Sequence, residues 1–393
     1  MLKEIPICDV KLGSYIIKLD QELWSRPFPI GGFLVDDYTT IYHLHNCGLR
    51  QVTVDVSKTS RVKPKKWSIG SEKREEPDNK KPKVAPVFAD DIGKRVYLAE
   101  THYAKAVSEV AKLMRHVGEG KKLKIDMATR AAEVIVRSNE ASPHMLNATT
   151  RVKTREIYTY QHTVGVTSLL TSFAMQDKSS DEILEIAIGG ILHDIGKVPI
   201  PDEVLHKTER LTDEEFKLMK QHVRHSREIL YEDSKLTKIQ ADIALQHHMR
   251  PDGKGYDSGL SAEKISEIGA TAAIIDVYDA LSTRRVYKEA WEPTHALKNM
   301  LKWGEAQFNI PILTRFIKHM GIYPSGTCVL LESGRIGYVL MQNKDLLKPI
   351  VRLKLDTRTR RLMAEDLDLT AVKDDRIERV VSPFEYSLDE RII

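Results

Sequence analysis

The chain has 393 residues, of which 41% are hydrophobic and 30% charged, and its formal net charge is +4. This length allows two or three domains, and the composition is that of a globular protein rather than a disordered chain. The charge is too evenly balanced to indicate a DNA-binding protein.

The cysteines and the apolar segments indicate the compartment. The three cysteines, Cys8, Cys47 and Cys328, are far apart and form no CxxC pair. This spacing argues against a disulfide framework or a zinc ribbon and fits a reducing compartment. The first residues lack the cationic and apolar regions of a signal peptide, and no segment approaches 18 uninterrupted apolar residues. We therefore expect a cytoplasmic protein without a membrane span.

Residues 1–57 are predicted to form a small β-rich domain. A short helix is expected at 39–46, before Gly48, and the predicted strands are short apolar runs bounded by glycine and proline, at 15–17, 33–35 and 52–56. Residues 58–90 are dominated by Lys, Arg, Glu and Pro, which predicts a basic flexible linker. A patch for nucleic acid or an acidic partner is the alternative interpretation of that segment.

Helical patterns dominate the centre of the chain. Residues 91–150 carry apolar side chains at helical spacing and predict a helical connector. Residues 151–322 predict a helical domain in which two helices start with capping boxes, Ser179 with Glu182 and Thr212 with Glu215. These two helices are expected to carry the metal-type residues His193 and His222. Gly196, Pro199 and Pro201 are expected to stop the helix that ends at His193 and Asp194.

Alternating patterns return in residues 323–393, which predict a small β module. Its expected strands lie at 327–331, 336–340 and 350–353, and the turns at 333–334 and 343–345. The fold class is therefore mainly α, a helical bundle core with small β-rich modules at the N- and C-terminal ends.

Seven residues of the helical domain are of metal-ligand type. Successive groups are roughly 25 to 31 residues apart, which suits one position on each helix of a bundle. Five imidazoles and two carboxylates exceed the needs of one tetrahedral zinc ion and indicate two metals that share a carboxylate, for which Asp194 is well placed. Asp276 lies in a nearly continuous apolar helix, where an unpaired carboxylate is costly and indicates a cation. The set is His162, His193, Asp194, His222, His247, His248 and Asp276.

This donor set predicts both the metals and the chemistry. Imidazole with carboxylate suits iron, manganese, zinc or nickel better than magnesium or calcium. Two such ions can neutralise a phosphodiester, generate hydroxide at neutral pH and stabilise the leaving alkoxide. A phosphodiesterase is therefore the predicted class of enzyme.

The motifs around these residues resemble a known family. The ligand order, with Ile-Leu-His-Asp-Ile-Gly-Lys at 191–197, is similar to the HD superfamily of metal-dependent phosphohydrolases. The segment 247–257, His-His-Met-Arg-Pro-Asp-Gly-Lys-Gly-Tyr-Asp, followed by Asp-Val-Tyr-Asp-Ala-Leu at 276–281 and Arg-Val-Tyr-Lys at 285–288, resembles its HD-GYP subgroup of bacterial cyclic-di-GMP phosphodiesterases. The resemblance covers about 150–322 and implies an HD-type helical bundle. Residues 4–56 resemble the β-rich accessory domain of some HD-GYP proteins.

The resemblance implies a role for each site residue. It assigns His162, His193, Asp194 and Asp276 to one metal, and Asp194, His222, His247 and His248 to the other, with iron or manganese favoured over zinc or nickel. Lys197 would assist the leaving group or contact phosphate. Tyr256, Arg285 and Lys288 would contact the cyclic dinucleotide.

Two residues depart from the family pattern. Asp257 stands where the motif has proline, which adds a negative charge near an anionic substrate and removes a fixed φ. Tyr158 stands one helical turn before His162, where some members have a glutamate that recruits a third metal. We therefore expect two metals, and Asp257 leaves the exact substrate open.

The resemblance implies hydrolysis of cyclic-di-GMP to linear pGpG and further to GMP. Hydrolysis of 3′,3′-cyclic GMP-AMP is one alternative, and a weakly catalytic cyclic-dinucleotide sensor or adaptor is another. A diguanylate cyclase or other signalling protein is a further expected partner, and the chain is expected to form a homodimer. Asp279 is interpreted as a helix cap or as a partner of a ligand. His206, His225 and His295 are interpreted as surface residues or as contacts of the ligands.

Overall fold

In the computed structural model the chain forms two compact units, residues 1–97 and 98–393. The described residues are 2–6, 10, 13–18, 32–35, 40, 44, 51–58, 91–142, 145–149, 158–207, 209–231, 236–256, 264–283, 291–372, 374–386 and 388.

The first unit contains a four-stranded antiparallel sheet with the strand order β1-β4-β2-β3. Its strands are β1 (Leu2–Pro6), β2 (Tyr15–Lys18), β3 (Phe33–Leu34) and β4 (Gln51–Asp55). The three predicted apolar runs form β2, β3 and β4, and Ile16, Val52 and Val54 are buried. Strand β1 was not predicted. The predicted linker and almost all of the predicted short helix lie outside the described residues.

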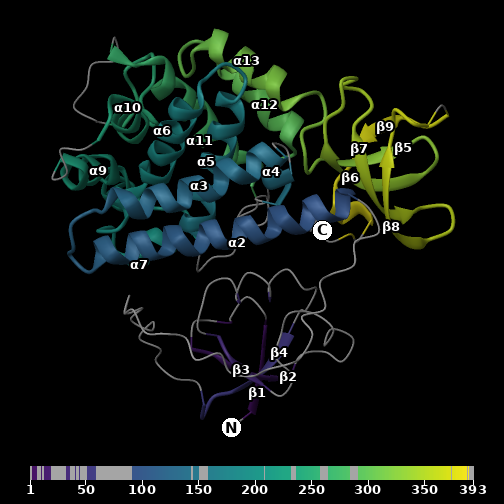
Figure 1. Ribbon diagram of the computed structural model, residues 1–393, viewed down its shortest axis with the longest axis horizontal. Helices are drawn as coiled ribbons and strands as arrows, with labels where there is room; N and C mark the ends of the chain where they lie inside the picture. The colour runs from purple at the N-terminus through teal and green to yellow at the C-terminus, as the bar shows by residue number, and fades with distance from the viewer. Residues whose placement is uncertain are drawn as a thin grey trace. The chain divides into compact units, whose positions relative to one another are not determined.

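Helices dominate the second unit, so the mainly α prediction is confirmed (Figure 1). Helices α3, α5 and α6 pack against one another, as do α10 with α6 and α11 with α5. The helices are α2 (Asp91–Gly118), α3 (Ile125–Ala141), α4 (Met145–Thr149), α5 (Tyr158–Ala174), α6 (Ser180–Leu192), α7 (Asp202–Leu205), α8 (Asp213–Lys220), α9 (His222–Tyr231), α10 (Lys238–Gln246), α11 (Glu267–Ser282), α12 (Pro293–Trp303) and α13 (Ile310–Met320), with a 3-10 turn, η3 (Ile195–Lys197).

Both predicted capping boxes are present. Ser179 starts α6 and Thr212 starts α8, and each side chain accepts a hydrogen bond from the backbone of a glutamate three residues later. The expectation that the Thr212 helix carries His222 is wrong, because α8 ends at Lys220 and His222 begins α9. Helix α6 ends at Leu192 and leaves His193 at its C-cap, as the stop signals predicted.

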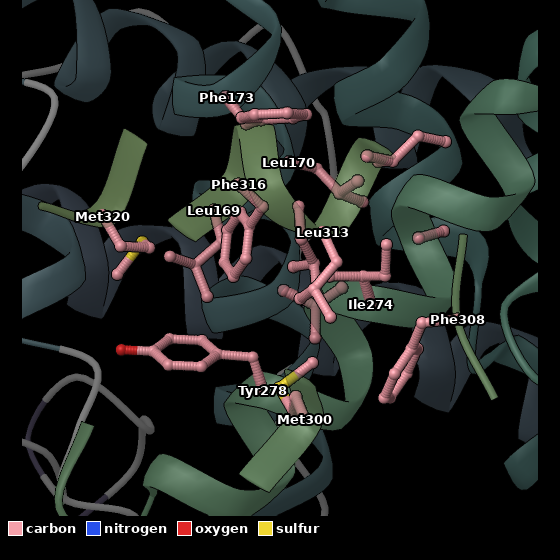
Figure 2. Close-up of a cluster of buried hydrophobic side chains, with 14 of the residues drawn as sticks. Leu169, Leu170, Phe173, Ile274, Tyr278, Met300, Phe308, Leu313, Phe316 and Met320 are labelled. Carbon is pink, nitrogen blue, oxygen red and sulfur yellow. The ribbon is translucent and has the colours of Figure 1, made fainter. Parts of the chain in front are cut away.

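The hydrophobic core of the bundle lies among α5, α6, α11, α12 and α13. Figure 2 shows Phe316 and Leu313 of α13 among residues of α5 and α11. The Phe316 ring packs edge-on against Phe173 at 5.8 Å and Tyr278 at 5.3 Å between ring centroids. Such apolar contacts fix the relative positions of α5 and α11, two helices that carry predicted ligands.

Two glycines allow the close approach of elements around α6. A Cβ on Gly196 of η3 would lie 1.9 Å from the carbonyl oxygen of His222, so α9 can lie against η3 only because this residue has no side chain. A Cβ on Gly190 would lie 2.8 Å from the Thr167 hydroxyl of α5. These close approaches bring the end of α6 next to α5 and α9.

The C-terminal part of the second unit is a five-stranded antiparallel sheet with the order β8-β7-β6-β5-β9. Gly334, at φ +83°, forms the turn between β5 and β6, as its place in a Ser-Gly pair predicted. Strands β8 and β9 were not predicted. The elements are β5 (Cys328–Leu331), β6 (Arg335–Met341), β7 (Ile350–Asp356), β8 (Arg361–Asp368), β9 (Ile377–Val380) and the 3-10 turn η5 (Pro383–Tyr386).

Among the described residues, no helix combines the length and the hydropathy that crossing a bilayer requires.

Candidate metal centre

The structure brings all seven predicted metal ligands together. They come from α5, the end of α6, the start of α9, the end of α10 and the middle of α11. Their ligand atoms form two groups, each within 4.8 Å: His162, His193 and Asp276 in one, and Asp194, His222, His247 and His248 in the other. His248 is partly exposed and the other six are buried.

Asp194 lies between the two groups. Its Oδ2 is 3.6 Å from Nε2 of His162 and 3.3 Å from Nε2 of His193. Its Oδ1 is 3.6 Å from Nε2 of His222 and 3.9 Å from Nε2 of His247. Each oxygen of this carboxylate therefore faces a different group, which is the arrangement that a bridging ligand needs.

The imidazoles are oriented by acceptors on their outer side. In three of them Nδ1 donates to the carbonyl oxygen three residues earlier: His193 to Gly190 (2.7 Å), His222 to Met219 (2.7 Å) and His247 to Ala244 (3.0 Å). His162 donates from Nδ1 to Oδ2 of Asp279 at 2.6 Å. Because a carbonyl oxygen can only accept, Nδ1 of His193, His222 and His247 carries the proton, and Nε2 of each neutral ring is left with a lone pair that points inward.

Buried acceptors in the centre have no proton to share. The Nε2 atoms of His222 and His247 lie 3.4 Å apart, and both Nδ1 protons are already donated elsewhere. Within the described residues, Nε2 of His193 and Oδ1 of Asp194 have no hydrogen-bond partner. Buried polar atoms are rarely left without one. Lone pairs that converge in this way fit divalent metal ions, and the donor set is of the kind that transition metals prefer.

The pKa shifts of the side chains in the centre also favour the binding of a cation. Burial by itself would raise the pKa of Asp194, but the charges of Lys197 and His193 lower the pKa well below its ordinary value. Burial opposes a charge on His193, yet the Asp194 and Asp276 carboxylates raise its pKa overall. Burial lowers the pKa of His222 to about 3. The carboxylates are thus ionised while His222 is neutral at pH 7, as metal binding requires.

Asp276 connects the two groups from α11. Its Oδ1 lies 3.0 Å from Nε2 of His162, and its Oδ2 lies 3.4 Å from Nδ1 of His248. Although burial opposes its ionisation, the contact with His162 and the charges of the neighbouring imidazoles lower the pKa of Asp276 overall. Asp279, one helical turn later, holds the other side of the His162 ring. Asp279 therefore contacts a predicted ligand, which was one of its two sequence interpretations.

Lys197 is the cation nearest to Asp194 among the described residues. Its Nζ lies 2.5 Å from Asp194 Oδ2, and η3 holds the lysine at the edge of the centre. Lys197 also lines a cleft of about 940 Å³ that opens onto His162, His222, His247 and Asp276. The amine can therefore reach a ligand bound in the cleft.

The cleft has further cationic and aromatic walls. The ring centroid of Tyr256 is 4.3 Å from that of His248, and its backbone N–H donates to the His248 carbonyl oxygen at 3.0 Å. A Cβ on Gly255 would lie 2.4 Å from the same carbonyl oxygen, so glycine is needed before Tyr256. Sequence reasoning missed other residues of the wall: Arg210, Phe216, Lys220, Arg250 and Lys254.

Comparison with known proteins identifies the family. Residues 136–308 match the HD domain family, and residues 2–128 match a domain of unknown function, DUF3391. Over 375 residues the chain is 34% identical to "Cyclic di-GMP phosphodiesterase PA4108" of Pseudomonas aeruginosa, covering 92% of this chain and 87% of that protein. This chain belongs to the HD-GYP family. The family resemblance predicted from the motifs is therefore confirmed.

Other relatives match a shorter part of this chain. "Cyclic di-GMP phosphodiesterase response regulator RpfG" of Xanthomonas campestris is 43% identical over 120 residues, 30% of this chain and 32% of that protein. "3'3'-cGAMP-specific phosphodiesterase 2" of Vibrio cholerae is 35% identical over 129 residues, 33% of this chain and 25% of that protein. The relatives are thus named after two different cyclic dinucleotides.

Of the remaining HD-GYP positions, the described residues include Tyr158. Tyr158 stacks on His162, with 5.8 Å between ring centroids and 6° between ring planes, and it lines the cleft. Asp257, Arg285 and Lys288 lie outside the described residues, so their predicted roles stay predictions.

Proposed function

We propose that this chain is a metal-dependent phosphodiesterase that hydrolyses cyclic-di-GMP to linear pGpG and further to GMP. The observation that carries the proposal is the position of Asp194, whose two oxygens face two separate groups of metal-type side chains. Its family membership and its relative from Pseudomonas aeruginosa, named for this activity, support the same substrate.

The proposed centre holds two divalent transition-metal ions. His162, His193, Asp194 and Asp276 would hold one, and Asp194, His222, His247 and His248 the other. When bound, such ions neutralise phosphate oxygens and lower the pKa of water. We favour iron or manganese, and zinc and nickel tolerate the same donors. Tyr158 supports two ions rather than three, because its ring stacks on His162 and a phenol is a poor ligand.

The chain's own residues position the substrate and move a proton. Lys197 carries its ammonium at the edge of the centre, where it can contact a phosphate oxygen and donate a proton to the departing 3′ oxygen. Tyr256 forms the adjoining wall, and burial raises the pKa of its hydroxyl to about 12, so the phenol stays neutral beside an anionic ligand. Arg285 and Lys288 are proposed to contact the dinucleotide as well.

The test uses both candidate substrates. Metal-replete protein is incubated with cyclic-di-GMP and with 3′,3′-cyclic GMP-AMP, and the products are separated by chromatography. We expect faster conversion of cyclic-di-GMP, and metal analysis of anaerobically purified protein should find two ions per chain. Preferred turnover of cyclic GMP-AMP would change the substrate. Tight binding without turnover of either nucleotide, unchanged by Asp194→Ala, would favour a sensor or adaptor.

The proposal extends to partners and location. We propose a cytoplasmic protein that forms a homodimer and docks on a diguanylate cyclase or another signalling protein. Light scattering of the purified chain tests the dimer, and a monomer at micromolar concentration would contradict it. Co-purification with a diguanylate cyclase tests the second contact.

A further inference from the structure

A row of aromatic rings leads outward from the metal centre along one wall of the cleft. The Tyr256 ring lies next to His248, and the Phe216 ring of α8 packs edge-on against Tyr256 with 6.0 Å between centroids and 82° between planes. All three residues line the same cleft. The row therefore connects a predicted metal ligand to the outer part of the cleft.

Phe216 is not placed there by the hydrophobic core. Its side chain is 42% exposed, and α8 has no buried residue. The helix is instead held by polar contacts, namely its capping box and two hydrogen bonds from Lys207 to Glu215. An exposed phenyl ring at the wall of a cleft, on a helix without buried residues, is available to a ligand.

The neighbours of Phe216 indicate what kind of ligand fits. The Nζ of Lys220 lies 5.1 Å from the centroid of the phenyl ring, and Arg210 and Lys254 line the same cleft. A flat apolar face beside several cations suits a ligand that combines an aromatic base with phosphates. The long stem of Lys220 lets its ammonium move aside when a base covers the ring.

We propose that the exposed ring of Phe216, with Tyr256 against it edge-on, forms a stacking platform for a purine base of the nucleotide whose phosphate lies at the metal centre. The identity of this ligand, a purine nucleotide, rests on the proposed function. Base–aromatic stacking tolerates different bases, so Phe216 contributes affinity for a purine nucleotide rather than a choice between guanine and adenine.

The first test is kinetic and uses Phe216→Ala, with Leu218→Ala as the matched control. Leu218 is on the same helix and is 39% exposed, but it does not line the cleft. We expect Phe216→Ala to raise KM for cyclic-di-GMP about 10- to 100-fold. Metal content and kcat should stay unchanged, because the base contact is the same in the ground and transition states. Phe216→Tyr should restore KM.

The second test does not depend on turnover. Phe216→Trp places an indole in the platform, and stacking of a guanine base should quench its fluorescence relative to wild type. GMP is expected to quench it, whereas ribose 5-phosphate, which has the phosphate without the base, is not.

The outcomes of the two tests are separable. An unchanged KM in Phe216→Ala, or equal quenching by GMP and ribose 5-phosphate, would overturn the platform. Quenching by GMP alone, in a protein that turns over no cyclic dinucleotide, would support the platform and refute the proposed function.

Discussion

In the C-terminal sheet, the carboxylates of Asp366 and Asp375 lie against guanidinium groups, whereas the buried carboxylates of the metal centre in the helical bundle lie among imidazoles. Asp366 of β8 lies directly opposite Arg352 of β7 in the ladder, and its two oxygens accept hydrogen bonds from Nε and Nη2 of the guanidinium at 2.7 Å each. Asp375 accepts from Arg335 at 2.6 Å. The sheet thus neutralises these carboxylates with side chains close to them in the fold.

The buried carboxylates of the metal centre have different neighbours. Asp194 and Asp276 are buried, and among the described residues the cation bound to them is Lys197, which reaches Asp194 alone. The other neighbours are imidazoles whose lone pairs converge. The comparison teaches when a buried carboxylate indicates a metal site. It does so when the surrounding side chains are acceptors, and not when they are permanent cations such as arginine.

Replacing the shared carboxylate should have the largest effect. Asp194→Ala is expected to lower both bound metals and to reduce turnover of cyclic-di-GMP by at least about 10³-fold, since it removes the group between the two sets of donors. Elemental analysis and product chromatography measure this. Asp202→Ala, at an exposed position of α7, is the control. Full metal content in Asp194→Ala would contradict a shared ligand.

The second prediction concerns Lys197, the cation that contacts Asp194. Lys197→Met keeps the apolar stem but removes the ammonium, so kcat should fall about 10²- to 10³-fold while both metals stay bound. The matched control is Lys178→Met, whose ammonium lies 4.0 Å from Asp177, outside the cleft. A kcat equal to that of wild type would remove Lys197 from the reaction.

Asp279 tests whether the carboxylate behind a ligand matters. Asp279→Asn keeps the size and an acceptor oxygen but removes the charge behind His162, and such changes reduce metal affinity about 10- to 100-fold. Competition with a chelator measures the affinity, and Asp181→Asn in the first turn of α6 is the control. Equal affinities in the two variants would make Asp279 a helix cap alone.

The sheet should respond through stability and not through activity. Asp366→Ala removes a cross-strand pair and is expected to lower the free energy of unfolding by up to about 1 kcal/mol. Denaturant unfolding of this variant, of Arg352→Ala and of the double variant isolates the pair energy. Turnover per bound metal should equal wild type, and a fall in it would connect the sheet to the active centre.

Much of this architecture follows from local signals. The capping boxes at Ser179 and Thr212 predicted where α6 and α8 begin, because Ser or Thr followed by Glu satisfies two backbone groups at once. The gathering of the ligands followed from one ligand position per helix. The contact of Asp279 with the centre could also be predicted, since Asp279 lies one helical turn from Asp276 on the same helix.

Other features have no local signal. The break between α8 and α9 falls at Lys220–His222, without glycine or proline, and strand β1 ends in Pro6 at the edge of its sheet, where proline is tolerated. Phe216 looks in the sequence like any exposed apolar residue. Its place on the wall of the cleft depends on how α8 approaches residues 250–256, which is a tertiary property.

The wide spacing of the seven metal-type side chains has a consequence for biosynthesis. His162 leaves the ribosome long before Asp276, and α11 must dock before the His162 ring acquires its partners on both sides. The centre is therefore complete only after nearly the whole bundle has been synthesised, so metal loading should be a late event in maturation. Nascent chains arrested before α11 should retain less metal than chains arrested after α13. Metal uptake would then indicate that the bundle has folded completely.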